Sequence, residues 1–277
     1  MHSMEEFMKS RISALVICIV IVFTCGCVDY QQVVESMQEG STAKNTNKTK
    51  VSLNDINCDG KIEEIAIENN SILLLSETKV LGRFEPHKDL EYENVSAAVI
   101  DIDNDNVMEI VVYAHVDTEH NNNKIMCVYV IDSKNTGEYY LRDMPEEITG
   151  IYSYSGVDAK VEPLDEYKYV INCVNNEFKI DASRVYGLST LDVENREKLE
   201  DRWTDMLEKK LTGEVLGVVS AQIIYQDENQ KCIRYYELVK GIDRKDIGRL
   251  VVDVFLDKDG TYKIVGVDYI ENVDYQP

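Results

Sequence analysis

Basic residues are scarce in this chain relative to acidic ones. The 277 residues include 29 Lys and Arg against 51 Asp and Glu, which gives a formal net charge of -22 at pH 7. Binding to DNA, RNA or an anionic membrane surface depends on a basic face that neutralises phosphates. The charge therefore argues against a nucleic-acid partner. We expect most of it to solvate the surface, while a fraction of the acids binds cations.

Recognisable catalytic motifs are also missing. The sequence contains no Gly-X-Ser-X-Gly elbow, no phosphate-binding glycine loop and no dinucleotide-binding fingerprint. His115 and His120 lie in one stretch with Asp117 and Glu119, and two imidazoles with two carboxylates are a donor set that zinc accepts. An alternating strand would spread these side chains over both faces, and their spacing matches no zinc motif. We expect a solvated loop there and assign no catalytic residue.

Cysteine occurs in a pattern that fits no disulfide framework. Three of the seven cysteines lie among the first 27 residues, and the other four are widely spaced single residues. An even number in an exported chain permits disulfides. Two of the four fall inside apolar, strand-like runs, where a free cysteine behaves as a small hydrophobe, so we expect buried thiols. The four are Cys58, Cys127, Cys173 and Cys232.

Residues 1–27 predict an export signal. Lys9 and Arg11 form a basic start, and residues 12–23 form an apolar run that is short for a bilayer span of about 20 residues. The segment resembles a bacterial lipoprotein signal, which implies that Cys27 is lipidated and holds the chain on the extracytoplasmic face of the cell membrane. An uncleaved membrane anchor is the alternative interpretation.

The chain then changes from a polar segment to a β-rich one. Residues 28–50 have little to bury and predict a flexible tether. Residues 51–190 contain short β-branched runs separated by Asn, Asp and Gly, which predict an all-β repeat domain. The expected strands are Glu64–Glu68, Ile72–Leu75, Lys79–Arg83, Val95–Ile100, Glu109–Val116, Ile125–Ile131, Glu138–Leu141, Ile148–Tyr154, Val157–Val161, Tyr167–Val174 and Glu177–Ile180.

Residues 191–277 predict an α+β module. Asp192 suits the start of a helix and Gly213 its stop, and the helix would cover one face of an antiparallel meander. Its apolar face is formed by Leu199, Trp203, Met206, Leu207 and Leu211. The expected strands of the meander are Glu214–Gln226, Lys231–Lys240, Arg249–Leu256 and Thr261–Ile270.

Two acidic loops share one pattern at a distance of 46 residues. In Asp55–Glu63 and in Asp101–Glu109, positions one, three and five carry Asp or Asn, position six carries Gly or Asn, and position nine carries Glu. Alternating oxygen ligands in a tight loop suit Ca²⁺, with a backbone carbonyl at position seven. The predicted ligands are Asp55, Asn57, Asp59, Lys61 and Glu63 in the first loop and Asp101, Asp103, Asp105, Val107 and Glu109 in the second.

An EF-hand opens with the same spacing, but it requires a glutamate at position twelve and flanking helices. Position twelve is Ala66 in the first loop and Val112 in the second, and the residues after each loop favour strands. On these motifs, residues 50–145 resemble the FG-GAP or VCBS-like repeats of integrin-type β-propellers. The resemblance implies that each loop joins the first two strands of a four-stranded blade and binds Ca²⁺. The second loop carries four carboxylates and the first three, so we expect tighter binding at the second.

The expected fold class is mainly β. One more period places a third blade without an ion site over residues 148–180, and three blades do not close a ring. We therefore expect an incomplete or atypical propeller-like array of short antiparallel strands, followed by the α+β module. The expected function is a membrane-anchored, extracytoplasmic lipoprotein whose calcium-stabilised β repeats act as a scaffold or bind a ligand or partner, such as a cell-surface protein or a polysaccharide. The alternatives are an extracellular hydrolase or lyase and a purely structural envelope component.

Overall fold

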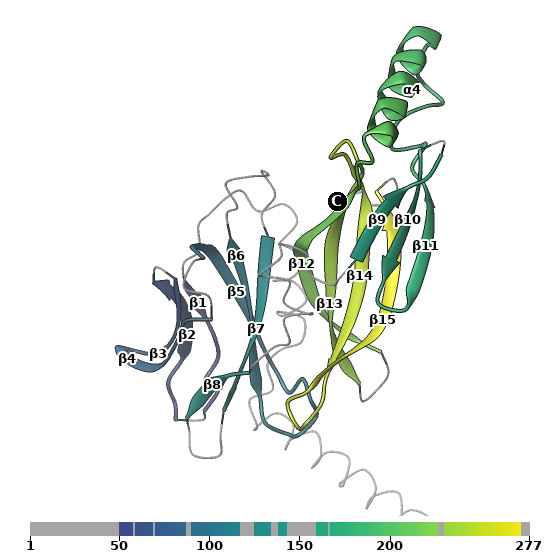
Figure 1. Cartoon of the computed structure of the whole chain (residues 1–277). Coiled ribbons are helices and arrows are strands. Elements are labelled where there is room, and N and C mark those ends of the chain that lie inside the picture. The colour runs from purple at the N-terminus through teal and green to yellow at the C-terminus, as the bar shows by residue number, and fades with distance from the viewer. Residues whose placement is uncertain are drawn as a thin grey trace, which may run out of the picture. The chain divides into compact units, whose positions relative to one another are not determined.

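The structure is a computed structural model that describes nine segments of the chain, all within one compact unit (Figure 1). They are residues 50–57, 59–68, 70–86, 90–116, 125–133, 138–142, 159–165, 167–226 and 230–272. The expected signal, Cys27 and all of the expected tether except Lys50 lie outside them. In the described part of the chain, no helix has both the length and the apolar character that crossing a membrane requires.

The described residues fold into four small antiparallel sheets and one helix. In each sheet, strands that neighbour each other in sequence pair side by side, so every sheet is an up-and-down meander. The first sheet contains β1 (Lys50–Ser52), β2 (Glu63–Glu68), β3 (Ser71–Ser76) and β4 (Lys79–Phe84), and the second contains β5 (Tyr92–Ile100), β6 (Glu109–Val116), β7 (Ile125–Ser133) and β8 (Tyr139–Leu141). The third contains β9 (Ala159–Pro163), β10 (Lys168–Cys173) and β11 (Asn176–Asp181), and the fourth contains β12 (Glu214–Tyr225), β13 (Lys231–Lys240), β14 (Asp246–Leu256) and β15 (Tyr262–Glu271).

The mainly-β prediction is confirmed, and the described strands form no closed propeller. The expected meander at the C-terminal end is the fourth sheet, and β6 and β13 have the bounds that the sequence predicts. The expected strand Ile148–Tyr154 lies outside the described residues. The third sheet has three strands, and none of its described connections carries an acidic loop.

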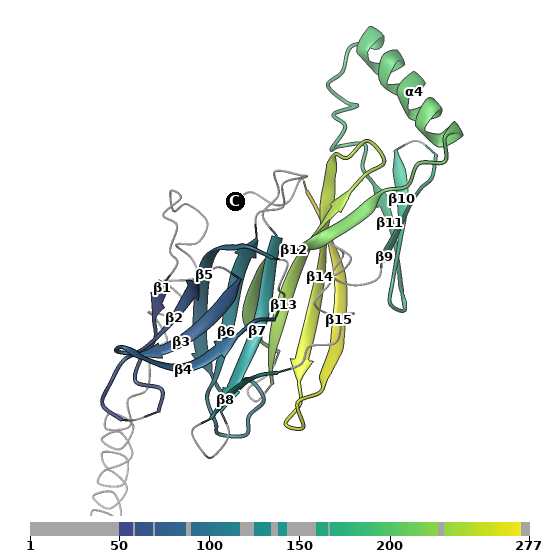
Figure 2. The same cartoon turned by 60° about the vertical axis from the view of Figure 1, so that its left-hand side comes forward.

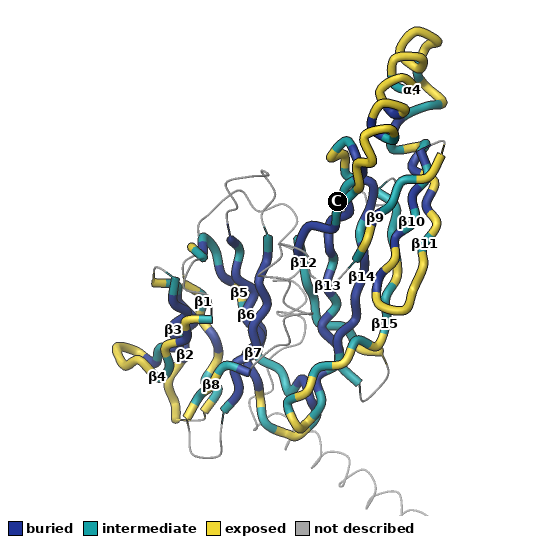
Figure 3. The backbone as a smooth tube through the Cα atoms, in the orientation of Figure 1, coloured by how far each residue is buried: buried dark blue, intermediate teal, exposed yellow. Residues whose placement is uncertain are grey.

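The second sheet is buried on both faces (Figure 3). Val111 and Tyr113 of β6 belong to a core shared with the third and fourth sheets. Ile110 and Val112 of the same strand belong to a core shared with the first sheet. Because successive side chains of a strand point to opposite faces, this alternation places one core on each side of the second sheet.

The sheets do not follow one another in space as they do in sequence. β5 contacts β1 and β2, β7 contacts β12, and β12 contacts β9 (Figure 2). The second sheet is therefore followed by the fourth sheet, against which the third packs. Val161 and Gly213 form an isolated bridge at the latter contact, where a Cβ atom on Gly213 would lie 2.4 Å from the carbonyl oxygen of Lys240. Glycine is required there because the backbones approach too closely for any side chain.

The helix α4 (Val193–Glu208) begins where the sequence predicts but ends earlier. Asp192 caps its start by accepting a hydrogen bond from the backbone N–H of Asn195 at 2.8 Å. The predicted stop at Gly213 is wrong. Lys210 adopts the left-handed conformation at φ 54°, and the backbone N–H of Leu211 bonds back to the carbonyl of Met206 at 3.2 Å. This pairing satisfies a carbonyl of the last turn without a glycine.

The helix packs against the third sheet rather than lying across the fourth as expected. Only Trp203 and Met206 of its sixteen residues are buried (Figure 3). The ring centroid of Trp203 lies 4.6 Å from that of Tyr167 and 5.6 Å from that of Tyr169. Tyr167 directly precedes β10 and Tyr169 is its second residue, so an aromatic cluster holds the helix at that sheet. The expected domain boundary at residue 190 falls between β11 and α4, and one core includes side chains from both sides of it.

Candidate metal centre

Both acidic loops join the first two strands of a four-stranded sheet. The first loop, Asp55–Glu63, lies between β1 and β2, and the second loop, Asp101–Glu109, lies between β5 and β6. Each loop ends in a glutamate that is also the first residue of the next strand, and both glutamates are fully buried. The described strands thus place the two loops at equivalent points of two meanders.

The same set of hydrogen bonds shapes both loops. The carboxylate at position one accepts from the backbone N–H groups of positions five and six, at 3.0 and 2.8 Å in the first loop and 3.0 and 3.3 Å in the second. The side-chain oxygen at position three accepts from position five, at 2.9 and 3.1 Å. The carboxylate at position five accepts a hydrogen bond from the backbone N–H of position seven, at 2.9 Å in the first loop and 2.7 Å in the second. The carboxylate at position nine accepts one from the backbone N–H of position two, at 2.8 and 2.7 Å. The loops are therefore structural repeats of each other.

Position six turns each loop back on itself. Gly60 has φ 85° and Asn106 has φ 72°, both in the left-handed region that the sequence pattern requires of these positions. Glycine and asparagine adopt that region at lower cost than other residues. Asn104 is also left-handed, at φ 59°. This backbone path is what points the alternate side chains of the loop inward.

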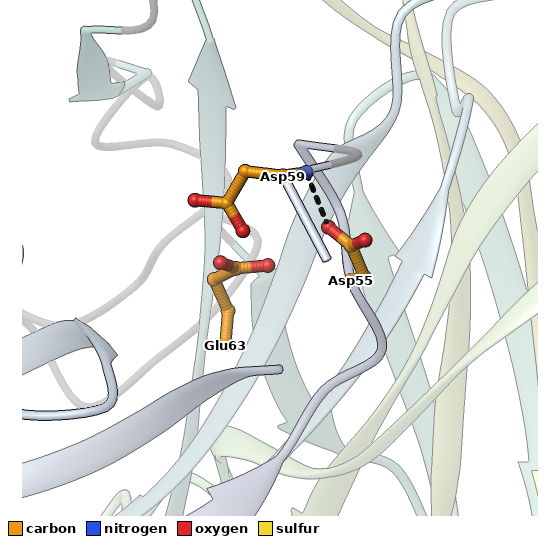
Figure 4. A group of neighbouring side chains, drawn as sticks. All are labelled: Asp55, Asp59 and Glu63. Carbon is orange, nitrogen blue, oxygen red and sulfur yellow. Dashed lines mark hydrogen bonds between the residues drawn. The ribbon is translucent and has the colours of Figure 1, made fainter. Parts of the chain in front are cut away.

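Three carboxylates converge in the first loop (Figure 4). Oxygen atoms of Asp55, Asp59 and Glu63 lie within 4.8 Å of one another. Asp59 and Glu63 turn their carboxylates toward each other in Figure 4. At position three, the side-chain amide of Asn57 donates to Glu63 Oε1 at 3.3 Å. Asp59 is exposed and Asp55 is half-buried, so this cluster opens to solvent.

Three carboxylates also converge in the second loop, but in a buried setting. Oxygen atoms of Asp101, Asp103 and Glu109 lie within 4.8 Å of one another, and Asp103 and Glu109 are almost completely buried. Asp105, the fourth predicted side-chain ligand, accepts the backbone N–H of Val107 and is not among the three. In the part of the chain that the structure describes, no other group of three potential ligands comes this close together.

A buried arginine that the sequence analysis missed enters the second loop. Arg142 follows β8, and its side chain is 5% exposed. Its Nη2 donates to Asp103 Oδ2 at 2.7 Å and lies 3.9 Å from Glu109 Oε1, while its Nε donates to Asp132 Oδ2 at 2.8 Å. Burial works to lower the pKa of the guanidinium, but the two aspartates outweigh it and leave that pKa raised. Arg142 is therefore a permanent cation inside this cluster.

Burial changes the protonation of Glu109 in this cluster. Burial raises the pKa of the Glu109 carboxyl to about 8, against the opposing hydrogen bond from the backbone N–H of Ile102. Its Oε1 accepts no hydrogen bond from the described residues. In the first loop the corresponding Oε1 accepts from Asn57, whereas Asp103 has no proton to donate at that position. The residue at position three thus decides whether the glutamate is satisfied within the loop.

The two loops lie close to the same short strand. Tyr139 of β8 packs against the core that the first and second sheets share, and burial, followed by the charges of Glu63, Asp59 and Asp55, raises its pKa. Arg142, only three positions further along, enters the second. Lys231 of β13 approaches the second loop from the fourth sheet, where its Nζ donates to the backbone carbonyl of Asp101. No spacing in the sequence signals these cross-sheet contacts.

The histidine-containing stretch is only partly described. His115 lies in β6 and is half-buried, whereas Asp117, Glu119 and His120 lie outside the described residues. Cys127, Cys173 and Cys232 are buried thiols, as expected, and Cys58 lies outside the described residues.

The chain was compared with models of known protein families, with curated proteins and with solved structures, and it matches none of them. The interpretation of the two loops therefore depends on their own chemistry. The converging groups that could bind a metal ion are carboxylates, together with the side-chain amide of Asn57 in the first loop. No thiol or imidazole is among them. Oxygen donors of this kind suit hard divalent cations such as Ca²⁺ rather than zinc or copper.

Proposed function

We propose that this chain is a membrane-anchored, extracytoplasmic lipoprotein whose β repeats bind Ca²⁺ and serve as a scaffold for a ligand or partner. The observation that carries the proposal is the repeated loop, in which the same hydrogen bonds bring three carboxylates together at the same point of two sheets. Carboxylates held within 4.8 Å repel one another, and a divalent cation relieves that repulsion. The anchor rests on the signal-like segment that ends at Cys27.

The stacking of the first two sheets supports a propeller-like array similar to FG-GAP repeats. Ile65 of β2 corresponds to Val111 of β6 in the 46-residue repeat. Ile65 faces the second sheet, and Val111 faces the fourth sheet, which is the next layer. Equivalent faces therefore point in the same direction along the stack, as blades do. The array remains open and atypical, because its next layer is the fourth sheet and not the third.

An exposed apolar residue beside each acidic loop supports a binding role. Ile62 and Met108 occupy position eight of the two loops and are 59% and 55% exposed. Single exposed apolar side chains are common, but the same position in both repeats favours a shared use. A loop whose charges are balanced would hold each of these side chains at the start of β2 or β6, in contact range of a cell-surface protein or a polysaccharide. In this interpretation Ca²⁺ is structural, and the neighbouring loop residues contact the partner.

Thermal unfolding tests the calcium claim. The full chain in detergent is compared in chelator, in about 10 mM Ca²⁺ and in about 10 mM Mg²⁺. A site with an affinity of roughly 0.1–1 mM raises the melting temperature in Ca²⁺ by roughly 3–10 °C. Asp59→Asn removes a converging carboxylate of the first loop while its side-chain oxygen can still accept the backbone N–H of Lys61. This variant therefore loses the part of the gain in melting temperature that the first loop contributes.

Asp259→Asn is the matched control, because Asp259 also caps a turn through a hydrogen bond from the backbone N–H of Thr261 but belongs to no carboxylate cluster. It keeps the full calcium response. An identical melting temperature in chelator and in Ca²⁺ for the wild-type protein would remove the basis of the proposal. For the binding role, Ile62→Ser with Met108→Ser is compared with Val193→Ser, which is 74% exposed on α4. Calcium-dependent crosslinking on intact cells is lost in the first variant and kept in the second.

A further inference from the structure

The two repeated loops differ in how their negative charge is balanced. Among the described residues, Asp55, Asp59 and Glu63 of the first loop form no ion pair, and the basic side chain of the loop, Lys61, is exposed and pairs with Glu77 outside the loop. In the second loop, Arg142 contacts Asp103 and Asp132 and lies within 4 Å of Glu109. Its side chain is nearly inaccessible, like those of the three acids that it contacts.

Burial makes the difference consequential. Asp103 and Glu109 are 1% and 0% exposed, so water cannot solvate a negative charge on either side chain. A buried carboxylate must be paired, metal-bound or protonated, because its desolvation is otherwise too costly. The first loop avoids most of this cost, since Asp59 and Asn57 are exposed. The second loop needs a positive charge whether or not a metal ion is available.

The residue at position three explains why the second loop needs a positive charge and the first does not. In the first loop, Asn57 donates a hydrogen bond to the buried glutamate. Asp103 occupies this position in the second loop and adds a charge instead of a proton. Its Oδ2 faces the guanidinium of Arg142 at 2.7 Å. The extra carboxylate and the arginine therefore compensate each other, and each would be destabilising without its partner.

We propose that Arg142 is a tethered counter-ion that takes the place of a divalent cation in the second loop, so that Ca²⁺ binds the first loop alone. This inference rests on the proposed calcium binding. It reverses the expectation that four carboxylates make the second loop the tighter site. One of these carboxylates, Asp103, is already neutralised by the fixed positive charge of Arg142. A Ca²⁺ ion entering the second loop would lie close to the Arg142 guanidinium, and the two positive charges would repel each other strongly.

The arginine balances the charge of the second loop but leaves one ligand atom unused. Glu109 Oε1 is buried and accepts no hydrogen bond from the described residues, and Glu109 belongs to the carboxylate group with Asp101 and Asp103. The nearest guanidinium nitrogen is 3.9 Å away, which is too long for a hydrogen bond. Arg142 Nη1 likewise makes none among the described residues. Removing the guanidinium therefore leaves a cluster of oxygen ligands that a divalent cation can enter.

Calcium stoichiometry of the full chain in detergent, measured by equilibrium dialysis, tests the proposal with matched variants. The wild-type protein binds one Ca²⁺, Asp59→Asn binds none, and Asp105→Asn, the equivalent change in the second loop, still binds one. Arg142→Met opens the second loop and binds two. Arg142→Lys keeps the positive charge and binds one. Circular dichroism shows which variants are folded at each calcium concentration.

Two results would overturn the proposal. One is a wild-type protein that binds two Ca²⁺ and loses one of them in Asp105→Asn. The other is a folded Arg142→Met variant that gains neither a bound Ca²⁺ nor a calcium-dependent rise in melting temperature. If Arg142→Met folds only when Ca²⁺ is added, the counter-ion role is supported. If it does not fold under either condition, the wild-type and Asp105→Asn stoichiometries decide.

The same measurements separate this inference from the function on which it rests. A wild-type protein that binds no Ca²⁺, together with an Arg142→Met variant that binds one, contradicts the proposed calcium-binding function but keeps the counter-ion role. In the converse case the wild-type protein binds one Ca²⁺, Asp59→Asn loses it, and Arg142→Met gains none. That result supports the proposed calcium-binding function and contradicts the counter-ion role of Arg142.

Discussion

The first and second repeats place one loop in two environments. Their backbone hydrogen bonds correspond position by position, yet the converging carboxylates of the first loop include the exposed Asp59, whereas those of the second loop include the buried Asp103 and Glu109. The first sheet contributes one face to the core that it shares with the second, whereas the second sheet is covered on both faces. Local sequence thus sets the shape of the loop, and the layers packed around it set how its charges are balanced.

Stability without metal gives the largest effect. Arg142→Met leaves Asp103 and Asp132 buried without their partner, which we expect to cost about 3–5 kcal/mol in the free energy of unfolding. Arg83→Met, in the first sheet, breaks the ion pair with Glu68 in which both side chains are about half exposed. That change costs only about 0–1 kcal/mol. Urea unfolding of both variants in chelator measures the difference.

Equal losses in the two variants would mean that the buried arginine balances no more charge than an exposed one. Such a result would erase the contrast between the two repeats. Arg142→Lys, which keeps a charge but not the two-sided contact with Asp103 and Asp132, is expected to fall between the wild-type protein and Arg142→Met.

The pH dependence of stability gives a smaller effect in the second repeat. In the folded protein the pKa of Glu109 is raised to about 8, whereas an ordinary glutamate has a pKa of 4.5. Between these two pH values Glu109 keeps its proton in the folded protein and loses it in the unfolded chain. The folded state therefore binds more protons between these values, and the free energy of unfolding falls as pH rises through them. Relative to Glu109→Gln, the wild-type protein loses roughly 2–4 kcal/mol between about pH 5 and about pH 8. Urea unfolding in calcium-free buffer checks this, and parallel pH profiles would contradict it.

The two faces of the second sheet give the smallest effect. In the core shared with the first sheet, the hydroxyls of Tyr92 and Tyr129 lie 2.8 Å apart. In the opposite core, the hydroxyl of Tyr113 makes no hydrogen bond with the described residues. Tyr92→Phe costs about 1 kcal/mol, while Tyr113→Phe changes stability by less than about 0.5 kcal/mol or raises it. Thermal unfolding compares them, and a larger loss for Tyr113→Phe would indicate a polar partner in that core.

Much of the local structure could be predicted from the sequence. The strand from Glu109 to Val116 is bounded by an acidic loop on one side and polar residues on the other, and its β-branched run leaves no other assignment. Asp192 marked the start of the helix because its carboxylate can accept a hydrogen bond from the first turn. The shape of both acidic loops followed from Gly60 and Asn106, which tolerate the left-handed backbone.

The contacts between layers could not be predicted in this way. Arg142 lies 39 positions from Asp103, and a single arginine after a strand carries no periodic signal. The helix ends before Gly213 because that glycine is needed where two backbones meet, and Lys210 accepts the strained conformation instead. The order of the sheets depends on which faces pack together, and that is decided by long-range contacts such as those between β7 and β12.

The contact between Lys231 and the second loop has a consequence for the order of folding. The lysine donates to a carbonyl that lies 130 positions earlier in the chain. Closing so long a segment carries an entropic cost, and contacts of large sequence separation slow folding. During synthesis the second loop emerges well before the strand that completes it. The last sheet to be made therefore determines when the second repeat reaches its final form, and until then its acidic loop is open to whatever cations surround the nascent chain.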